Sequence, residues 1–464
     1  MPRPPTITRD RLVPLIRSRG PVSATELAAL LGVNRTTIGR ALRDFGDELV
    51  TLGATRSTRY LLRRSVRGIG NRWPIHRIDE TGRASEWAEL EALHDRAWRL
   101  SWAGTPPAWA GYFGDEHGRL NGLPFFLQDV RPQGFLGRII ARQLSDRLGV
   151  PEDPRRWGDE DALVYLHAEG RDLPGDLVVG DRCLREALAI TAGSREVRLV
   201  PMESPEAAYA EEARTIAETA PGSSAGGEQP KFIARLVDGT GAIRQAIVKF
   251  SPPVDQPVGE RWADLLLCEF HAHEVLSTAG LAESGARIID AAGRRFLEVP
   301  RFDRTGAGGR RGVVSMESLA AAALGSVPRD WPSGGSDLMR EGLVHADSLR
   351  VLRKLHAFGE LIGNTDMHAG NVAFFLGDTL PLEPTPAYDM LPMLWAPGVQ
   401  GEIVERRFTP EPPVPAMTGV WRESAALAAE FWRRVIDDPR LSSSRAEAAR
   451  QAGDIVERLR QHVG

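Results

Sequence analysis

The chain has 464 residues, of which 42% are hydrophobic and 26% are charged. This composition is typical of a soluble globular protein with about three domains, and it excludes disordered and fibrous classes. No apolar run reaches the roughly 18 residues of a membrane helix, and the N-terminus lacks the apolar core of a signal peptide. The two cysteines, Cys183 and Cys268, suit a reducing compartment. We therefore expect a cytoplasmic protein with no membrane partner.

The net charge of −4 is distributed unevenly along the chain. Residues 1–64 contain 12 arginines and 5 acidic residues, which gives +7, whereas the remaining residues sum to −11. A basic N-terminal module on an acidic body indicates that one end of the molecule contacts nucleic acid.

Residues 1–64 have the pattern of a winged helix-turn-helix. Leu12 and Ile16 indicate a first helix, Ser23 to Glu26 form a capping box that opens a second helix, and Asn34 caps a third. Residues 49–62 then resemble a two-stranded wing. We predict that duplex DNA binds the outward residues of the third helix and the wing, namely Arg35, Thr36, Thr37, Arg40, Arg43, Arg56 and Arg59. A small helical module that binds only protein remains the alternative.

Residues 65–200 are less informative. Their tryptophans, Trp87, Trp98, Trp102 and Trp109, fit a hydrophobic core better than a stacking platform for nucleic acid. We expect these residues to form a separate subdomain ahead of a larger catalytic core.

Two of the chain's three lysines follow the subdomain. Lys231 closes a Gly/Ser-rich loop at 222–231, which could bring backbone N–H groups close to phosphate, although it lacks the Walker A spacing. Lys249 ends the strand-like run Ala246-Ile247-Val248-Lys249-Phe250. A strand lysine that contacts nucleotide phosphates is the arrangement found in protein kinases. Lys354 falls on an amphipathic helix and is expected to be solvated.

The most informative residues are Asp366, Asn371 and Asp389. Leu349, Leu352, Leu355, Phe358 and Ile362 predict an amphipathic helix that ends just before them, and residues 372–376 predict a short strand. An Asp, an Asn five residues later and a second Asp after a hairpin are the catalytic pattern of kinases. The first Asp acts on the acceptor hydroxyl, while the Asn and second Asp offer Mg²⁺ hard oxygen ligands.

Together these motifs resemble the HipA-type serine/threonine kinases of bacterial toxin–antitoxin systems. The matching segments are 224–231, Val248-Lys249-Phe250, Arg301-Phe302-Asp303-Arg304, 363–371 and Tyr388-Asp389. The resemblance implies an α+β, two-lobed protein-kinase-like fold behind the winged helix-turn-helix. We expect domains at 1–64, 65–200 (a HipA-like N-terminal subdomain), 201–304 (the N-lobe core with the phosphate loop) and 305–464 (the helical C-lobe with the catalytic loop).

By this resemblance Asp366 is the catalytic aspartate and Asn371 and Asp389 hold Mg²⁺. ATP would be bound by Lys249, by the loop residues Ser224, Gly226, Gly227, Gln229 and Lys231, by the hinge residues Glu298, Val299, Pro300, Arg301 and Phe302, and by His368. Ser224 matches a loop serine that such kinases phosphorylate on themselves. Glu269 resembles the helix glutamate of the family, but a surface helix charge is an equal alternative.

The resemblance implies an ATP-dependent toxin kinase that inhibits growth by phosphorylating a protein, for example a translation factor or an aminoacyl-tRNA synthetase. In that family the DNA-binding domain is commonly a separate antitoxin chain, so its fusion here leaves open whether such an antitoxin exists. Two alternatives also stay open. One is a small-molecule kinase resembling aminoglycoside phosphotransferases, and the other is a DNA-binding regulator whose kinase fold only senses a ligand.

Overall fold

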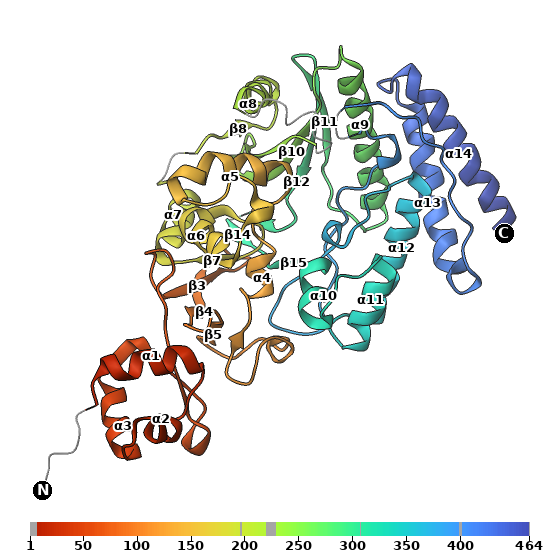
Figure 1. The fold of residues 1–464 in the computed structure, drawn as a ribbon. Coiled ribbons are helices and arrows are strands. Elements are labelled where there is room, and N and C mark those ends of the chain that lie inside the picture. The colour runs from red at the N-terminus through yellow and green to blue at the C-terminus, as the bar shows by residue number, and fades with distance from the viewer. Residues whose placement is uncertain (1–6, 195–196, 220–228, 307, 399–400, 464) are drawn as a thin grey trace, which may run out of the picture.

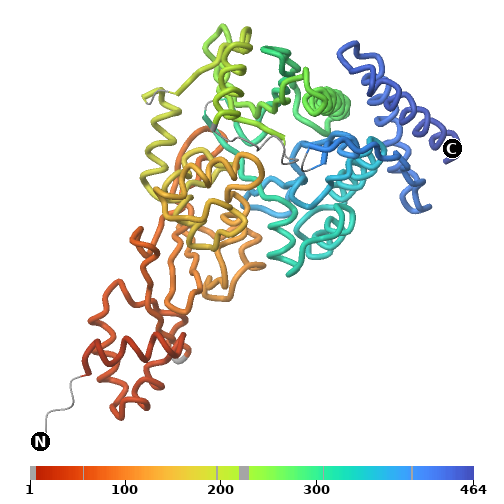
Figure 2. Tube along the Cα trace, turned by 45° about the horizontal axis from the view of Figure 1, so that its top comes forward, coloured from red at the N-terminus to blue at the C-terminus, as the bar shows by residue number. Residues whose placement is uncertain are grey.

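The computed structural model describes residues 7–194, 197–219, 229–306, 308–398 and 401–463. It forms an elongated molecule in which the N-terminal unit projects from one end and the two C-terminal helices lie at the other (Figures 1 and 2). Within the described residues, no helix has both the length and the apolar character needed to span a bilayer.

Three helices and a hairpin make up the N-terminal unit. They are α1 (Arg9–Arg19), α2 (Ala24–Leu31), α3 (Arg35–Arg43), β1 (Leu49–Leu52) and β2 (Arg59–Leu62). The predicted capping box of α2 is confirmed, because Ser23 Oγ accepts from Glu26 N at 3.1 Å while Glu26 Oε2 accepts from Ser23 N at 2.7 Å. Asn34 caps α3 as expected, and Leu12, Ile16 and Ile38 fill the small core.

A five-stranded antiparallel sheet, in the order β6-β5-β4-β3-β7, forms the centre of the middle unit. Its strands are β3 (Arg72–Ile78), β4 (Ala84–Ala92), β5 (Trp98–Trp102), β6 (Arg119–Leu120) and β7 (Leu177–Val179), accompanied by helices α4 (Phe125–Gln128), α5 (Gly134–Leu148), α6 (Asp159–Glu169) and α7 (Asp181–Thr191). Trp87, Trp98 and Trp109 are buried in the core, as predicted, and Trp102 packs edge-on against two of them.

The wing-like hairpin of the N-terminal unit docks on this middle unit. Val50, Leu52 and Leu61 share a buried cluster with Leu93 and Ala97 of the turn that follows β4. The backbone continues the contact, since His94 N donates to Leu62 O and Arg64 N donates to Ala92 O, both at 2.9 Å. The two units therefore meet through a packed junction.

The upper lobe is a second five-stranded sheet between two helices. Its order is β11-β12-β10-β9-β8. The strands are β8 (Val200–Pro201), β9 (Lys231–Val237), β10 (Ile243–Phe250), β11 (Arg287–Ala291) and β12 (Arg294–Pro300), and the helices are α8 (Glu206–Thr219) and α9 (Pro257–Thr278). Phe296 packs with Tyr209 of α8, whereas the next residue, Leu297, packs with Leu266 of α9. Because successive strand residues face opposite sides, the two helices cover opposite faces.

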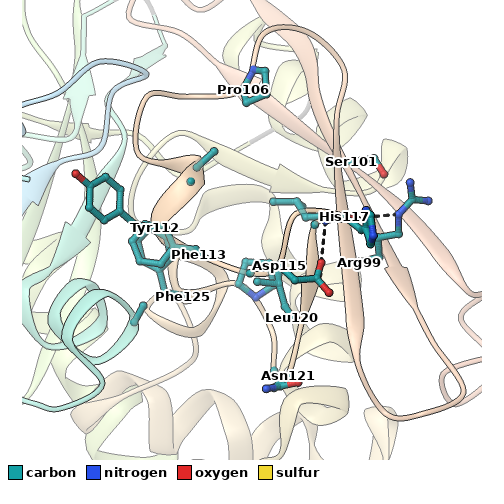
Figure 3. Close-up of a pocket in the computed structure, with 18 of the residues that line it drawn as sticks. Arg99, Ser101, Pro106, Tyr112, Phe113, Asp115, His117, Leu120, Asn121 and Phe125 are labelled. Carbon is teal, nitrogen blue, oxygen red and sulfur yellow. Dashed lines mark hydrogen bonds between the residues drawn. The ribbon is translucent and has the colours of Figure 1, made fainter. Parts of the chain in front are cut away.

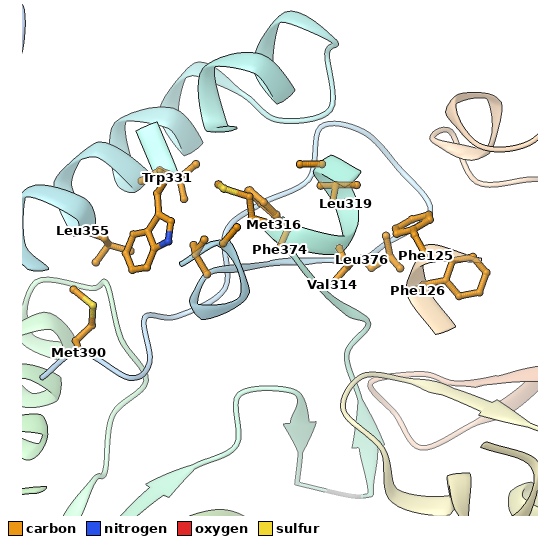
Figure 4. Close-up of a cluster of buried hydrophobic side chains, with 14 of the residues drawn as sticks. Phe125, Phe126, Val314, Met316, Leu319, Trp331, Leu355, Phe374, Leu376 and Met390 are labelled. Atoms are coloured by element: carbon orange, nitrogen blue, oxygen red, sulfur yellow. The ribbon is translucent and has the colours of Figure 1, made fainter. Parts of the chain in front are cut away.

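The lower lobe is mainly helical. It contains α10 (Met316–Leu324), α11 (Trp331–Arg340), α12 (Ala346–Ile362), α13 (Thr418–Asp437) and α14 (Ser443–Val463), with the short strand pairs β13 (Arg304–Thr305)–β14 (Gly309–Arg310) and β15 (Val313–Ser315)–β16 (Ala373–Phe375). The predicted amphipathic helix is α12, and the strand predicted at residues 372–376 is β16. Figure 4 shows Phe374 and Met316 of this lobe in one apolar cluster with Phe125 of the middle unit.

Candidate active site

Lys249 is the centre of a buried ionic cluster. Its Nζ donates to Glu269 Oε1 of α9 and also to Asp389 Oδ1, so it joins the upper lobe to the segment after the hairpin. The lysine is only 5% exposed. Glu269 is buried as well. It is therefore not a surface helix charge, and its position fits the helix glutamate of the family.

In this cluster two carboxyl groups bond one ammonium, and the charge of Lys231 also acts on both of them. Burial raises the pKa of Glu269 while the Lys249 ammonium opposes that rise, and Glu269 Oε2 has no hydrogen-bond partner among the described residues. Burial would also raise the pKa of Asp389, but the charge of Lys249 prevails and lowers it to about 2. For Lys249, burial opposes charging, yet the two carboxylates raise its pKa. Carboxylate oxygens such as those of Asp389 are the hard ligands that a divalent cation takes in proteins.

Two asparagines fix the loop that carries Asp366. Helix α12 ends at Gly363, whose φ of 76° is the left-handed conformation that favours glycine. Asn364 then donates from Nδ2 to Asp389 O at 3.2 Å and accepts from Asp366 N at 3.0 Å. Asn371 donates from Nδ2 to Asp366 O at 2.8 Å, which leaves its Oδ1 as an oxygen ligand. The structure thus brings the backbones of the three predicted residues together, with the Asp366 side chain exposed.

His368 and Tyr388 complete this loop. His368 Nδ1 accepts from Gly370 N at 3.0 Å, and Trp331 Nε1 donates to His368 O at 2.9 Å. Tyr388 donates from its hydroxyl to Gly370 O at 3.0 Å. Asp389 itself has φ 54°, a left-handed conformation that is uncommon outside glycine, so its carboxylate direction is set by a constrained backbone.

The two predicted phosphate lysines lie side by side. Lys231 of β9 pairs directly with Lys249 of β10 in the antiparallel register, so both side chains belong to the same face of the sheet. Ser224, Gly226 and Gly227 lie outside the described residues. Gln229 is described, and its buried Nε2 has no hydrogen-bond partner among the residues around it that the structure describes.

The sequence analysis named Val299 but missed the two isoleucines that form an apolar row with it on this face. Ile247 pairs with Ile233 on one side and with Val299 on the other, two residues along from the lysine pair. Ile233 is 43% exposed even though it is apolar. The sequence does contain a signal for this row. Ile233 lies two positions after Lys231 and Ile247 two positions before Lys249, and residues two apart in a strand share one face.

The predicted hinge residues divide into two groups. Val299 and Pro300 lie beyond the last residue of β12 that pairs with β11, so β11 does not bond their backbone. Phe302 stands 5.9 Å from the Tyr388 ring, centroid to centroid. Glu298 instead directs its side chain to the α8 face, where it accepts from Tyr209 at 2.5 Å and from Arg287 at 2.7 and 2.9 Å.

Arg301 also directs its side chain away from the predicted hinge. Its guanidinium donates to Asp303 at 2.9 and 2.8 Å and lies 3.6 Å from Asp172 of the middle unit. Arg304 joins both carboxylates as well. Arg301 to Arg304 thus form a buried ionic joint between the middle unit and the upper lobe.

The residues predicted to contact DNA are on the surface of α3. Arg35, Thr36, Arg40 and Arg43 are exposed and Thr37 is half-buried. The three arginines of α3 form no ion pair with any residue that the structure describes. Arg59 is instead paired with Glu26 at 2.6 Å, and the side chain of Arg56 lies outside the described atoms.

Comparisons with known proteins agree with this architecture. Residues 69–188 match the YjjJ-like toxin middle domain, and residues 223–463 match the HipA-like C-terminal domain. The chain is 34% identical to toxin YjjJ of Escherichia coli (strain K12) over 447 residues, which is 96% of this chain and 97% of that protein.

Two solved structures are similar at lower sequence identity than toxin YjjJ. One is HipA of Shewanella oneidensis MR-1, from a toxin–antitoxin complex with HipB and operator DNA, at 17% identity and a TM-score of 0.49, covering 84% of this chain and 97% of that one. The other is the Helicobacter pylori proinflammatory kinase CtkA, at 11% identity and a TM-score of 0.34, covering 48% and 94%. From the domain matches and the full-length relative, the chain belongs to the HipA-like toxin family, alongside toxin YjjJ.

Proposed function

We propose that this toxin-family protein is an ATP- and Mg²⁺-dependent serine/threonine protein kinase of the cytoplasm that inhibits growth. The observation that carries the proposal is the buried contact of Lys249 with both Glu269 and Asp389, beside a loop that exposes Asp366. The domains proposed from the sequence, 1–64, 65–200, 201–304 and 305–464, would then be a DNA-binding module, a supporting subdomain and the two catalytic lobes.

The residues of the site suit this chemistry. Bound Mg²⁺–ATP would supply the transferable phosphoryl group and part of its charge neutralisation. Asn371 Oδ1 and the Asp389 carboxylate are the hard oxygen donors for the cation, while Lys231 and Lys249 offer ammonium groups to phosphate. The row Ile233–Ile247–Val299 provides an apolar surface for adenine. Asp366 accepts the proton of the acceptor hydroxyl.

The test compares wild-type protein with Asp366→Asn and Asp389→Ala, using labelled ATP with and without cell lysate. We expect label on protein, a loss of about 100-fold or more in Asp366→Asn with nucleotide binding retained, and loss of Mg²⁺-dependent ATP binding in Asp389→Ala. Transfer by Asp366→Asn at more than a few per cent of wild type contradicts the assignment. Label only on small molecules would favour the aminoglycoside-kinase alternative, and binding without transfer would favour a ligand sensor.

Ser224 is proposed as a site of self-inactivation. A phosphoserine carries about −1.5 to −2 charges at neutral pH, which would repel both ATP phosphates and the carboxylates of Asp366 and Asp389. Mass spectrometry after incubation with ATP should find the modification. An unmodified Ser224 while another substrate is phosphorylated would contradict this proposal, as would full ATP affinity in Ser224→Asp.

A second function, binding of duplex DNA, is favoured by the exposed arginines of α3, which have no ion-pair partner in the described part of the chain. We propose a winged helix-turn-helix in which Arg35, Thr36, Thr37, Arg40, Arg43 and the wing residues Arg56 and Arg59 reach phosphates and base edges. A separate antitoxin and a translation factor or aminoacyl-tRNA synthetase as substrate are further proposed partners. Absence of duplex binding by the full chain even at low salt would defeat the DNA proposal in favour of a protein-binding module.

A further inference from the structure

The predicted metal ligands occupy the open end of one hairpin. Strand β16 begins two residues after Asn371, the chain turns at Gly377 and Asp378, and it returns to Asp389. The two arms are joined by hydrogen bonds from Phe375 N to Glu383 O at 2.8 Å and from Thr385 N to Ala373 O at 2.9 Å. Because the arms are bonded to each other, the position of the tip constrains the position of the open end.

The middle unit holds the tip of this hairpin through three hydrogen bonds. Trp109 Nε1 donates to Gly377 O at 2.7 Å, and Ala108 N donates to Asp378 O at 2.8 Å. Arg77 Nη1 donates to Asp378 Oδ1 at 2.7 Å. All three donors lie more than 250 residues before their acceptors, so the contact is purely tertiary.

The side chains that hold the tip are themselves fixed. Trp109 is 1% exposed and packs against the rings of Trp87 and Phe125. The guanidinium of Arg77 lies 4.6 Å above the Trp87 ring, and its Nε is 3.0 Å from a carboxylate oxygen of buried Asp176. Groups already held in one orientation lose little entropy when they bond the hairpin.

The segment after Trp109 makes a further contact with the lower lobe. It borders a hollow of 1120 Å³ beside β5 and α4 (Figure 3). In Figure 3 Tyr112 projects away from Asp115 and His117, and its hydroxyl donates to Glu341 O at 2.7 Å. The stretch of chain around Trp109 therefore contacts the lower lobe at Glu341 as well as at the hairpin tip.

We propose that Trp109 and Arg77 are positioning residues for the active site. By fixing the tip at Gly377 and Asp378, they hold Asn371 and Asp389 in the geometry that takes a divalent cation. The inference rests on the proposed function for the identity of the ligand. The claim that contacts at the tip hold the open end in place concerns the hairpin alone. It gives the middle unit of this chain a role in shaping the cation site in addition to packing.

The experiment uses the full chain with conservative substitutions. Trp109→Phe keeps an aromatic ring but removes the donor, and Arg77→Met removes the guanidinium while Arg77→Lys retains a cation. Trp102→Phe is the matched control from the same aromatic cluster, since among the described residues its indole makes no hydrogen bond to the hairpin tip. Arg72→Met, at the far end of β3, is the control for charge loss.

Two measurements separate the mechanical claim from the chemical one. Hydrogen exchange of residues 371–389, without nucleotide, should speed up in Trp109→Phe and Arg77→Met but not in the controls. The Mg²⁺ concentration for half-maximal ATP binding should rise about two- to tenfold for each lost hydrogen bond, with Arg77→Lys recovering most of the loss and the acceptor-substrate KM unchanged.

The outcomes distinguish the two ideas. If wild-type protein shows no Mg²⁺-dependent ATP binding, the proposed function fails, and the exchange data alone judge the hairpin contact. If exchange and Mg²⁺ dependence in Trp109→Phe and Arg77→Met match those of their controls, Trp102→Phe and Arg72→Met, the positioning role is wrong. Equal loss in Arg77→Lys and Arg77→Met would likewise overturn the part assigned to Arg77.

Discussion

Arginine serves opposite purposes in two regions of this molecule. On α3, Arg35, Arg40 and Arg43 are exposed and lack an ionic partner in the described structure. At the joint between the middle unit and the upper lobe, Arg301 and Arg304 are buried between two carboxylates. A free guanidinium is available to a phosphate, whereas one enclosed by aspartates stabilises the position of the segments that supply them.

This difference matters for assigning roles to charged residues. The hinge prediction for Arg301 rested on its place in a family motif, while its side chain is occupied by Asp303 and lies near Asp172. Each region can be disturbed separately, because substitutions in the buried joint should reduce stability and substitutions on α3 should reduce binding.

The largest effect is expected from Arg301→Met. Removing one partner from a buried ionic cluster leaves Asp303 undercompensated, which should lower the free energy of unfolding by about 3–5 kcal/mol. Urea denaturation followed by tryptophan fluorescence measures this change. A loss below 1 kcal/mol would show that the joint is not stabilising, and Arg40→Met provides the surface control.

On α3 the expected effect is on DNA affinity. Each lost phosphate contact should reduce the slope of log affinity against log salt by about 0.9, so replacing Arg35, Arg40 and Arg43 with Met should reduce it by up to about 2.7. The free energy of unfolding should change by less than about 0.5 kcal/mol per site. Binding of the triple variant with an unaltered slope would exclude these arginines from the interface.

Acid should weaken the buried joint but not α3. Burial raises the pKa of Asp303, but Arg301 and Arg304 outweigh burial and lower it to about 2, below the ordinary 3.8. The ionised group therefore stabilises the fold above about pH 4, and this contribution is lost as the pH falls through about 2. The stability difference between wild type and Asp303→Asn should shrink by about 2 kcal/mol between pH 5 and pH 2. A constant difference would argue against a strongly paired carboxylate.

The smallest effect concerns the capping box of α2. Ser23→Ala removes the acceptor for Glu26 N and should destabilise the N-terminal unit by about 1 kcal/mol. The protection of the backbone amides of residues 24–31 from hydrogen exchange, measured at increasing temperature, reports on the stability of this unit. Protection unchanged from that of wild type would mean that packing, and not the cap, decides where α2 begins.

Local signals allowed much of the fold to be predicted. The caps at Ser23 and Asn34, the amphipathic face of α12 and the Asp366–Asn371–Asp389 spacing all lie within short stretches of chain. Glu269 could not be decided in the same way, because α9 is buried around most of its circumference and only the position of Lys249 gives its carboxylate a purpose. The partners of Arg77 and Trp109, and Asp172 beside Arg301, are distant in sequence, and no local pattern encodes them.

The packed junction between the N-terminal hairpin and the turn after β4 has a hydrodynamic consequence. Val50, Leu52 and Leu61 are buried against Leu93 and Ala97, and Arg63 Nε donates to Glu91 at 2.6 Å on the same seam. From these contacts we expect the small unit and the large body to tumble as one particle with a single rotational correlation time. A molecule bound by α3 would then be held in a fixed orientation relative to the loop that carries Asp366.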